Sequence, residues 1–200
     1  GDVDKVVVPT AVDEKPYSPD IEKESGCTLV WIGSSSTRKY LEQHRQILEE
    51  VGVRFPNIIL KVIADFDFHL TNMDVVNVAW TLESEASQLS SAHIGIAPMS
   101  DNPWTRGKCA LKVIQYMAAG LPVISSNAGA NREVVVQGET GLLADSADDW
   151  LRAIELLSGN ESERNRLGSG GRQRMLQHYS SQTVLDSITE NLRSRALIPA

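Results

Sequence analysis

Cationic side chains are scarce in the middle of this chain and gather in one short segment. Within residues 62–131 the only lysines and arginines are Arg106, Lys108 and Lys112, and no acidic residue occurs from position 102 to position 131, although the formal net charge of the chain is −7. If residues 108–119 form a helix, Lys108 and Lys112 share one polar stripe with Gln115, while apolar residues cover the other sides. The pattern predicts a largely buried helix with positive charge at its first turns.

The charge at this helix start predicts a site for an anion. A helix N-terminus is already the positive end of the helix dipole, so lysines there do not stabilise the helix itself. Unbonded backbone N–H groups, the dipole and two ammonium groups together favour phosphate. The alternative is that both lysines extend to solvent and only cover apolar surface.

A longer motif continues from this segment. It consists of A-A-G-L-P-V at 118–123, a glycine-containing loop from Gly129 to Glu133, Gly138, and G-L-L at 141–143. In this order the residues resemble the C-terminal, donor-binding half of a GT-B glycosyltransferase of the retaining group 1 family (family 4). The resemblance extends over roughly residues 6–195.

The resemblance implies a doubly wound, Rossmann-like parallel α/β sheet that binds a nucleoside diphosphate-sugar without a metal or a cofactor. Lys108, Lys112 and Arg106 would stabilise the leaving diphosphate together with the backbone N–H groups of Ala110 and Leu111. The three cationic side chains form the predicted catalytic set, and Ala110 and Leu111 belong to the predicted donor-binding residues.

The family also has a pair of glutamates in this region, and this chain departs from both. The second glutamate of the family holds the ribose hydroxyls, and Gln115 occupies its position here. The first lies near the transferred sugar, and Gly107 occupies its position. Gly129 and Glu133 are expected to contribute to the donor site.

A second candidate phosphate site lies near the start of the chain. The apolar run T-L-V-W-I at 28–32 predicts a strand, Gly33, Ser34 and Thr37 form a turn, and the spacing of apolar residues predicts a helix over 37–51. Strand, small-residue turn and helix can present N–H and hydroxyl groups to phosphate. The alternative is that the hydroxyls only cap the helix.

The remaining apolar runs predict alternating strands and helices, which favours a parallel sheet with ligands beyond the carboxyl ends of the strands. Strands are expected at 58–64, 75–80, 93–97, 121–125 and 141–144, and helices at 84–91, 130–136, from Ser146 onward, at 161–179 and at 181–195. Asp65-Phe66-Asp67 is interpreted as a turn after a strand, not as a metal site. Trp104, in the 100–107 loop, is expected to anchor that loop, or else to contact a sugar.

The resemblance divides the chain into three parts. Residues 1–20, which open with a short strand, would be an interdomain connector, 21–180 the Rossmann-like domain, and 181–200 a helix that crosses back to an N-terminal domain absent from this chain. That domain would supply the contacts to the acceptor, whether sugar, lipid or another group, and any peripheral attachment to a membrane. The isolated chain is therefore expected to bind a donor and transfer little.

Bulk properties restrict the alternatives. Two hundred residues suit one domain, and a pI near 5.1 argues against nucleic acid as a partner. Cys27 and Cys109 lack metal-ligand spacing and are interpreted as reduced structural thiols of a cytoplasmic protein. A non-catalytic nucleotide or nucleotide-sugar binding module stays open as a second function. A response-regulator-like domain would need an acidic pocket, which the acid-free segment argues against.

Overall fold

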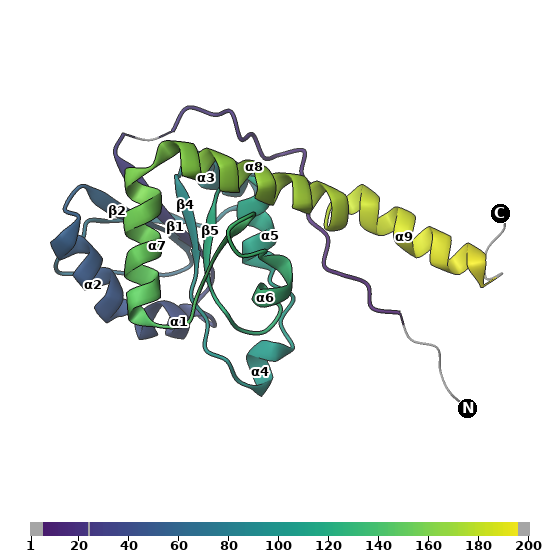
Figure 1. The fold of residues 1–200 in the computed structure, drawn as a ribbon, viewed down its shortest axis with the longest axis horizontal. Helices are drawn as coiled ribbons and strands as arrows, with labels where there is room; N and C mark the ends of the chain where they lie inside the picture. Colours follow the sequence, from purple (N-terminus) through teal and green to yellow (C-terminus); the bar gives the residue numbers. More distant parts are fainter. Residues whose placement is uncertain (1–5, 24, 196–200) are drawn as a thin grey trace.

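Six parallel strands form the centre of the protein, whose computed structural model describes residues 6–23 and 25–195 (Figure 1). The strand order in the sheet is β3-β2-β1-β4-β5-β6, so the chain reverses its direction of travel across the sheet between β1 and β4. The fold is therefore the doubly wound α/β architecture that the sequence predicts. The elements are β1 Cys27–Ile32, α1 Arg38–Gln43, α2 Arg45–Arg54, β2 Ile58–Ala64, β3 Val75–Ala79, α3 Leu82–Ser90, β4 Ile94–Ala97, α4 Pro103–Arg106, α5 Leu111–Ala118, β5 Val123–Ser126, α6 Asn131–Val134, β6 Gly141–Ala144, α7 Ala147–Gly159, α8 Glu161–His178 and α9 Ser181–Ser194.

Helices cover both faces of the sheet because successive side chains of each strand point to opposite sides. In β1, Leu29 and Trp31 pack into one core cluster with α1, α2 and α7. Val30 and Ile32 pack into the other with α3, α5 and α6. Both faces of the central strands are therefore buried, which explains their uninterrupted apolar runs.

The strands β1 and β4 separate at their carboxyl ends. Their register includes only Leu29↔Ile94 and Val30↔Gly95. Beyond these pairs the Tyr116 hydroxyl, from α5, accepts a hydrogen bond from the Ile32 N–H at 3.0 Å and donates one to the Ile96 carbonyl at 3.1 Å. A Cβ at Gly95 would lie 2.4 Å from Cγ of Tyr116, so glycine is needed there. The result is an opening at the point where the strand order reverses, the usual ligand site of such sheets.

Local structure near this opening differs from the sequence-based expectations. The helix expected over 37–51 is two helices, α1 and α2, separated at His44. The helix expected from Lys108 begins at Leu111. Ala110 ends the preceding loop with a left-handed φ of 55°, which breaks the helical path.

Two further expectations for irregular segments are wrong. The loop over 100–107 contains the short helix α4, because Asn102 forms a capping box with Thr105 and Pro103 follows at the first helical position. The segment 6–11 forms no strand, and its continuation makes a single bridge between Val12 and Ser180. The capping box predicted at Ser146 is present at the start of α7.

The last two helices run across and then away from the sheet (Figure 1). A Cβ at Gly168 of α8 would lie 2.2 Å from the Gly120 carbonyl oxygen, so glycine allows α8 to pack closely beside α5. Among the described residues of α9, only Val184 is buried. Residues 1–5 of the expected connector and 196–200 of the expected crossing helix lie outside the described residues, and the three-part division stays a prediction. Within 6–23 and 25–195, no helix is both long and apolar enough to cross a membrane.

Candidate functional site

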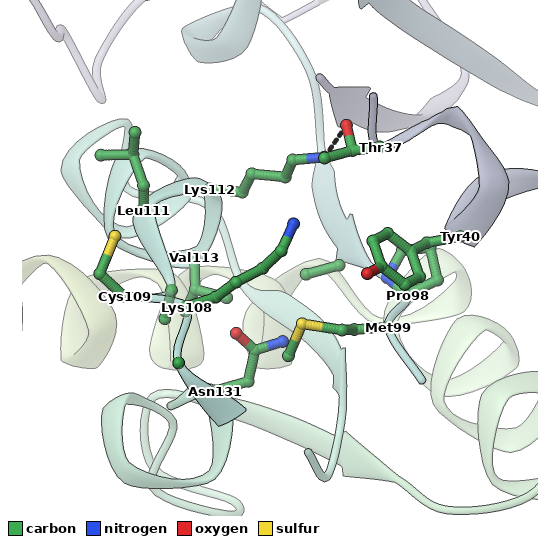
Figure 2. A pocket seen from close by; sticks show the side chains of 13 residues that line it. Thr37, Tyr40, Pro98, Met99, Lys108, Cys109, Leu111, Lys112, Val113 and Asn131 are labelled. Atoms are coloured by element: carbon green, nitrogen blue, oxygen red, sulfur yellow. Dashed lines mark hydrogen bonds between the residues drawn. The ribbon is translucent and has the colours of Figure 1, made fainter. Parts of the chain in front are cut away.

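Lys112 lies at the opening between β1 and β4. Its ammonium nitrogen is 3.9 Å from the centre of the Trp31 ring. The same nitrogen donates a hydrogen bond to Thr37 Oγ1 at 3.2 Å (Figure 2). A Cβ at Gly33 would lie 2.6 Å from that nitrogen and 2.2 Å from the Trp31 ring. The side chain of α5 therefore reaches the turn after β1, and glycine at position 33 makes room for it.

The charge of Lys112 has no counter-ion in the part of the chain that the structure describes. No carboxylate of the described residues forms an ion pair with it, and its neighbours are a hydroxyl and an aromatic face. Burial, and next the nearby charge of Lys108, lower the pKa of Lys112 to about 7. A partly desolvated cation without a partner is a favourable position for the negative charge of a ligand.

Lys108 approaches the same opening by a different route. It lies in the loop before α5, not on the helical stripe, and its ammonium group is 5.1 Å from the centre of the Tyr40 ring. Figure 2 shows both lysine side chains directed into the space between α5 and α1. The two lysines are thus brought together as predicted, although the predicted helix start is wrong.

Two cavities meet at Lys112, and Thr37 and Leu111 line both of them. The first, here called the lysine cavity, has a volume of about 350 Å³, and none of the described residues that line it is acidic. The second, the carboxylate cavity, has a volume of about 370 Å³. The other residues of the lysine cavity are Tyr40, Ala97, Pro98, Met99, Gly107, Lys108, Cys109, Ala110, Val113 and Asn131. Those of the carboxylate cavity are Ile32, Gly33, Ser34, Asp65, Trp80, Glu85 and Gln115.

The start of α5 adds backbone donors to the lysine cavity. No side chain of the described residues caps this end, where Ala110 is the N-cap residue. The first N–H groups of a helix have no partner within it, so those following Ala110 are available to a ligand. Ala110 and Leu111 both line the cavity, as their predicted role requires.

The turn after β1 is held by its own hydroxyls and by Asp65. Thr37 Oγ1 accepts a hydrogen bond from the Ser34 N–H at 3.1 Å. The Asp65 carboxylate accepts from the N–H and the hydroxyl of Ser35, at 2.7 and 3.0 Å, and these bonds hold its pKa below the usual range. Asp65 thus lies in the expected turn, but it also fixes the loop, which the sequence did not indicate. No group of three or more histidine, cysteine or acidic side chains in the described residues is arranged to hold a metal ion.

Three predicted site residues lie outside both cavities. Arg106 is 64% exposed and pairs with Asp101 at 2.9 Å. Gly129 has a φ of 50° and packs its backbone against Thr105. Glu133 is exposed on α6. Their roles in binding or catalysis stay predictions.

Two interpretations from sequence need correction. Trp104 is 73% exposed, so the expectation that it anchors its loop is wrong. Both cysteines are free, but Cys109 is exposed at the lysine cavity and does not pack in the core as a structural thiol.

Two functional candidates were missed. The Tyr40 hydroxyl is buried, has no hydrogen-bond partner in the described part of the chain, and points into the lysine cavity (Figure 2). Glu85 accepts a hydrogen bond from Gln115 at 2.6 Å in the carboxylate cavity. Neither has a local sequence signal, since Tyr40 occupies an ordinary helical position and Glu85 comes from a separate helix.

The fold and this opening define a Rossmann-like α/β protein of the kind found in GT-B glycosyltransferases. The sequence profile of the glycosyl transferases group 1 matches residues 17–160, and the chain belongs to that family. A curated relative, the MMP alpha-(1->4)-mannosyltransferase of Mycolicibacterium hassiacum, is 34% identical over 116 residues, which is 56% of this chain and 27% of that protein.

Solved structures of glycosyltransferases share the fold. Sucrose-phosphate synthase from Thermosynechococcus elongatus aligns with a TM-score of 0.75 at 19% identity, over 95% of this chain and 52% of that one. Anabaena Alr3699/HepE, solved in complex with UDP-glucose, aligns with a TM-score of 0.69 at 13% identity, over 92% of this chain and 56% of that one. The chain spans about a quarter of the curated relative and about half of each solved chain.

Proposed function

We propose that this chain is the donor-binding half of a retaining glycosyltransferase and holds a nucleoside diphosphate-sugar without a metal ion. The observation that carries the proposal is Lys112, a partly desolvated cation at the point where the two cavities meet, with no counter-ion among the residues that the structure describes. Retention and metal independence rest on the family resemblance. A relative of the same fold was solved with UDP-glucose, which is consistent with this class of donor.

The chemistry asked of the site is stabilisation of a leaving group. As the bond from the sugar to the diphosphate breaks, negative charge grows on the diphosphate oxygens. Lys112, Lys108 and the N–H groups at the start of α5 are positive or dipolar groups already directed at that charge. Groups fixed in place before the reaction stabilise such charge most effectively where water is partly excluded.

The acceptor and the rest of the machinery belong to a facing domain. The chain aligns with about half of each solved glycosyltransferase. We therefore expect residues 1–200 to bind a donor but to transfer the glycosyl group slowly, and the acceptor to contact the other half.

A second candidate function is a non-catalytic nucleotide or nucleotide-sugar binding module. The observation that favours it is the lack of any acidic side chain in the lysine cavity, where Gly107 occupies a position of the family's glutamate pair. Such a module would use the same lysines for binding and would not turn a donor over.

Calorimetric titration with UDP, GDP, ADP and their sugar conjugates tests donor binding. We expect one nucleotide series to bind the chain and Lys112→Met to weaken it, while Lys39→Ala has no effect. Lys39 is a suitable control, because it is an exposed lysine of α1 whose ammonium group is 5.2 Å from the same Tyr40 ring and it lines neither cavity. Absence of binding in the whole panel would contradict both candidates.

Turnover separates the two candidates. In a chain that also carries the facing domain, hydrolysis or transfer of the bound nucleotide-sugar, abolished by Lys112→Met, is expected of the glycosyltransferase. Tight binding with no turnover would favour the binding module instead.

A further inference from the structure

The lysine cavity presents hydrogen-bond donors, and none of its described residues supplies a negatively charged acceptor. Lys108 and Lys112 bring two ammonium groups to it, and the first N–H groups of α5 add further donors. The Tyr40 hydroxyl lies at the same wall, buried and without a hydrogen-bond partner in the described part of the chain. The polar groups of this cavity therefore favour a ligand that accepts hydrogen bonds and carries negative charge.

A neutral sugar would match these groups poorly. Each hydroxyl of a hexose brings an O–H donor, which needs an acceptor once the cavity excludes water. Ionised carboxylates are the strongest such acceptors among side chains. A carboxylate on the ligand reverses the requirement, because it only accepts and it is matched by ammonium, hydroxyl and N–H donors.

Lys108 is the cation placed for the part of the donor beyond the diphosphate. It lines the lysine cavity and not the carboxylate cavity, whereas Lys112 lines both. Its side chain extends across the cavity toward Tyr40, whose ring centre is 5.1 Å from the ammonium nitrogen (Figure 2). No carboxylate of residues 6–23 and 25–195 forms an ion pair with Lys108. Since two unpaired ammonium groups in one cavity repel each other, binding of a second anionic group beside the diphosphate is favourable.

Gly107, next to Lys108, lines the lysine cavity for no reason of backbone or packing. Its φ of −85° and ψ of 1° are accessible to other residues. An added Cβ would lie 3.6 Å from the Trp104 carbonyl oxygen, an ordinary contact distance. The family resemblance places a glutamate here, near the transferred sugar. Glycine thus removes a negative charge from the wall of the cavity, which would repel an anionic sugar.

We propose that the transferred glycosyl group carries a carboxylate, as a hexuronic acid does at C6, and that Lys108 pairs with this carboxylate and selects it over the neutral hexose. The inference rests on the proposed function and adds the chemical class of the sugar. Tyr40 supplies a neutral O–H donor from the facing side of the cavity.

The experiment compares two donors that differ only at C6, in the nucleotide series that residues 1–200 bind. The probe pairs are UDP-glucose with UDP-glucuronate, GDP-mannose with GDP-mannuronate, and ADP-glucose with ADP-glucuronate. Titration calorimetry gives the ratio of the two affinities. A hydrogen-bonded contact between charged groups strengthens binding by about tenfold or more, so we expect the wild type to prefer the uronate by at least about that factor.

Three lysine variants assign this preference to one side chain. Lys108→Gln should bring the ratio close to one, because it removes the charge but keeps a polar side chain. Lys108→Arg keeps the charge and should keep most of the preference. Lys39→Gln is the matched control, since it removes the same charge from an exposed lysine near the same Tyr40 ring that lines neither cavity. Its ratio should equal that of the wild type.

Gly107→Glu tests the same inference from the opposite direction. The added carboxylate should weaken binding of the uronate by about tenfold and leave the neutral hexose donor bound at least as well as before. Gly107→Gln has nearly the same size without the charge, so its ratio should stay close to that of the wild type. Both variants are compatible with the backbone at this position.

The outcomes separate this inference from the proposed function. Equal affinities of the wild type for both donors, or a preference for the neutral one, would overturn the inference and leave donor binding intact. A preference for the uronate that persists in Lys108→Gln would assign it to another group and also overturn the inference. Lys112→Met should weaken both donors alike, and no binding of any nucleotide or nucleotide-sugar would overturn both proposals.

Discussion

The lysine cavity and the carboxylate cavity share a wall, formed by Thr37, Leu111 and Lys112, but they differ in charge and polarity. No acidic side chain lines the first, whereas Asp65 and Glu85 line the second. Lys112 belongs to both. For a donor bound as proposed, the difference sets a direction: the diphosphate would lie against Lys112, the nucleoside would extend into the carboxylate cavity, and the transferred sugar would extend into the lysine cavity.

The same difference shows how the site relates to stability. Glu85 of the carboxylate cavity accepts hydrogen bonds from three protein donors, so its burial costs little stability. Lys112 contacts one hydroxyl and one aromatic face, and no carboxylate of the described residues pairs with its charge. The uncompensated charge is therefore concentrated at the shared wall, and variants there should have the largest effects on binding.

Among the variants at the two cavities, Lys112→Met is expected to change nucleotide affinity the most. Loss of the shared cation should weaken nucleotide binding by about 100-fold, the cost of removing a charge-assisted contact to phosphate. Because methionine suits an apolar site, the melting temperature should rise by about 2–4 °C. Titration calorimetry and thermal unfolding measure the two effects. Unchanged affinity would contradict the proposal that the diphosphate contacts Lys112 at the shared wall.

Gly33→Ala tests the close approach that places Lys112. The new Cβ would lie 2.2 Å from the Trp31 ring, with Lys112 Nζ at 2.6 Å. We expect about 1–3 kcal/mol of destabilisation in denaturant unfolding, together with weaker nucleotide binding. Gly159→Ala is the control, since nothing lies within 4 Å of its added Cβ. Equal stability of the two variants would contradict the described packing.

The pH dependence of binding tests the charge at the shared wall. With a pKa of about 7 in the empty site, Lys112 is already protonated below that pH and must take up a proton on binding above it. Affinity for a nucleotide-sugar should therefore be constant below pH 7 and fall above it, by up to about tenfold per pH unit. A nucleotide-sugar is the better probe, because a terminal phosphate titrates itself near pH 6.

Stability should change in the opposite sense over that range. The pKa of Lys112 is lowered in the folded state relative to the ordinary value of 10.5, so the unfolded chain binds more protons between about 7 and 10.5. The contribution of Lys112 to the free energy of unfolding therefore rises with pH through this window. Lys112→Met should abolish both dependences, and their persistence in that variant would assign them to another group.

Tyr40→Phe tests which part of the donor occupies the lysine cavity, through its effects on binding of a nucleotide-sugar and of the free nucleoside diphosphate. Its hydroxyl is buried at the lysine cavity without a partner in the described residues. If the transferred sugar occupies this cavity, the variant should bind a nucleotide-sugar about threefold to tenfold more weakly and the free nucleoside diphosphate equally well. Stability should not fall, because no protein hydrogen bond is lost. A loss shared by both ligands would place the hydroxyl near the diphosphate instead.

Much of the fold could be predicted because parallel strands buried on both faces leave continuous apolar runs. The runs at 28–32 and 58–64 correspond to β1 and β2 with at most one residue of difference. Helix starts were harder to predict. Ala110 adopts a left-handed conformation that its side chain does not favour, and only its tertiary surroundings hold it there.

Site residues could be predicted where one segment of the sequence carries cations and no acidic residues. They could not be predicted where the fold brings residues of distant segments together. Lys108 and Lys112 are conspicuous because no acidic residue lies near them in the sequence. Glu85 is thirty positions before Gln115, and only the folded chain brings the two side chains together at the carboxylate cavity. The role of Asp65 was unpredictable for the same reason, because its hydrogen bond to the Ser35 turn depends on the pairing of β1 with β2.

Arg106→Ala is expected to have the smallest effect on nucleotide affinity, and it tests whether the donor site extends beyond the lysine cavity. The guanidinium is exposed, pairs with Asp101, and lines neither cavity. Asp101 also pairs with Arg132 at 3.3 Å, so its charge stays partnered in the variant. Nucleotide affinity should change by less than about twofold and the melting temperature should stay nearly the same, since exposed ion pairs contribute little to stability. A tenfold loss of affinity would mean that Arg106 leaves Asp101 to contact the ligand, and the boundary of the donor site would then include α4.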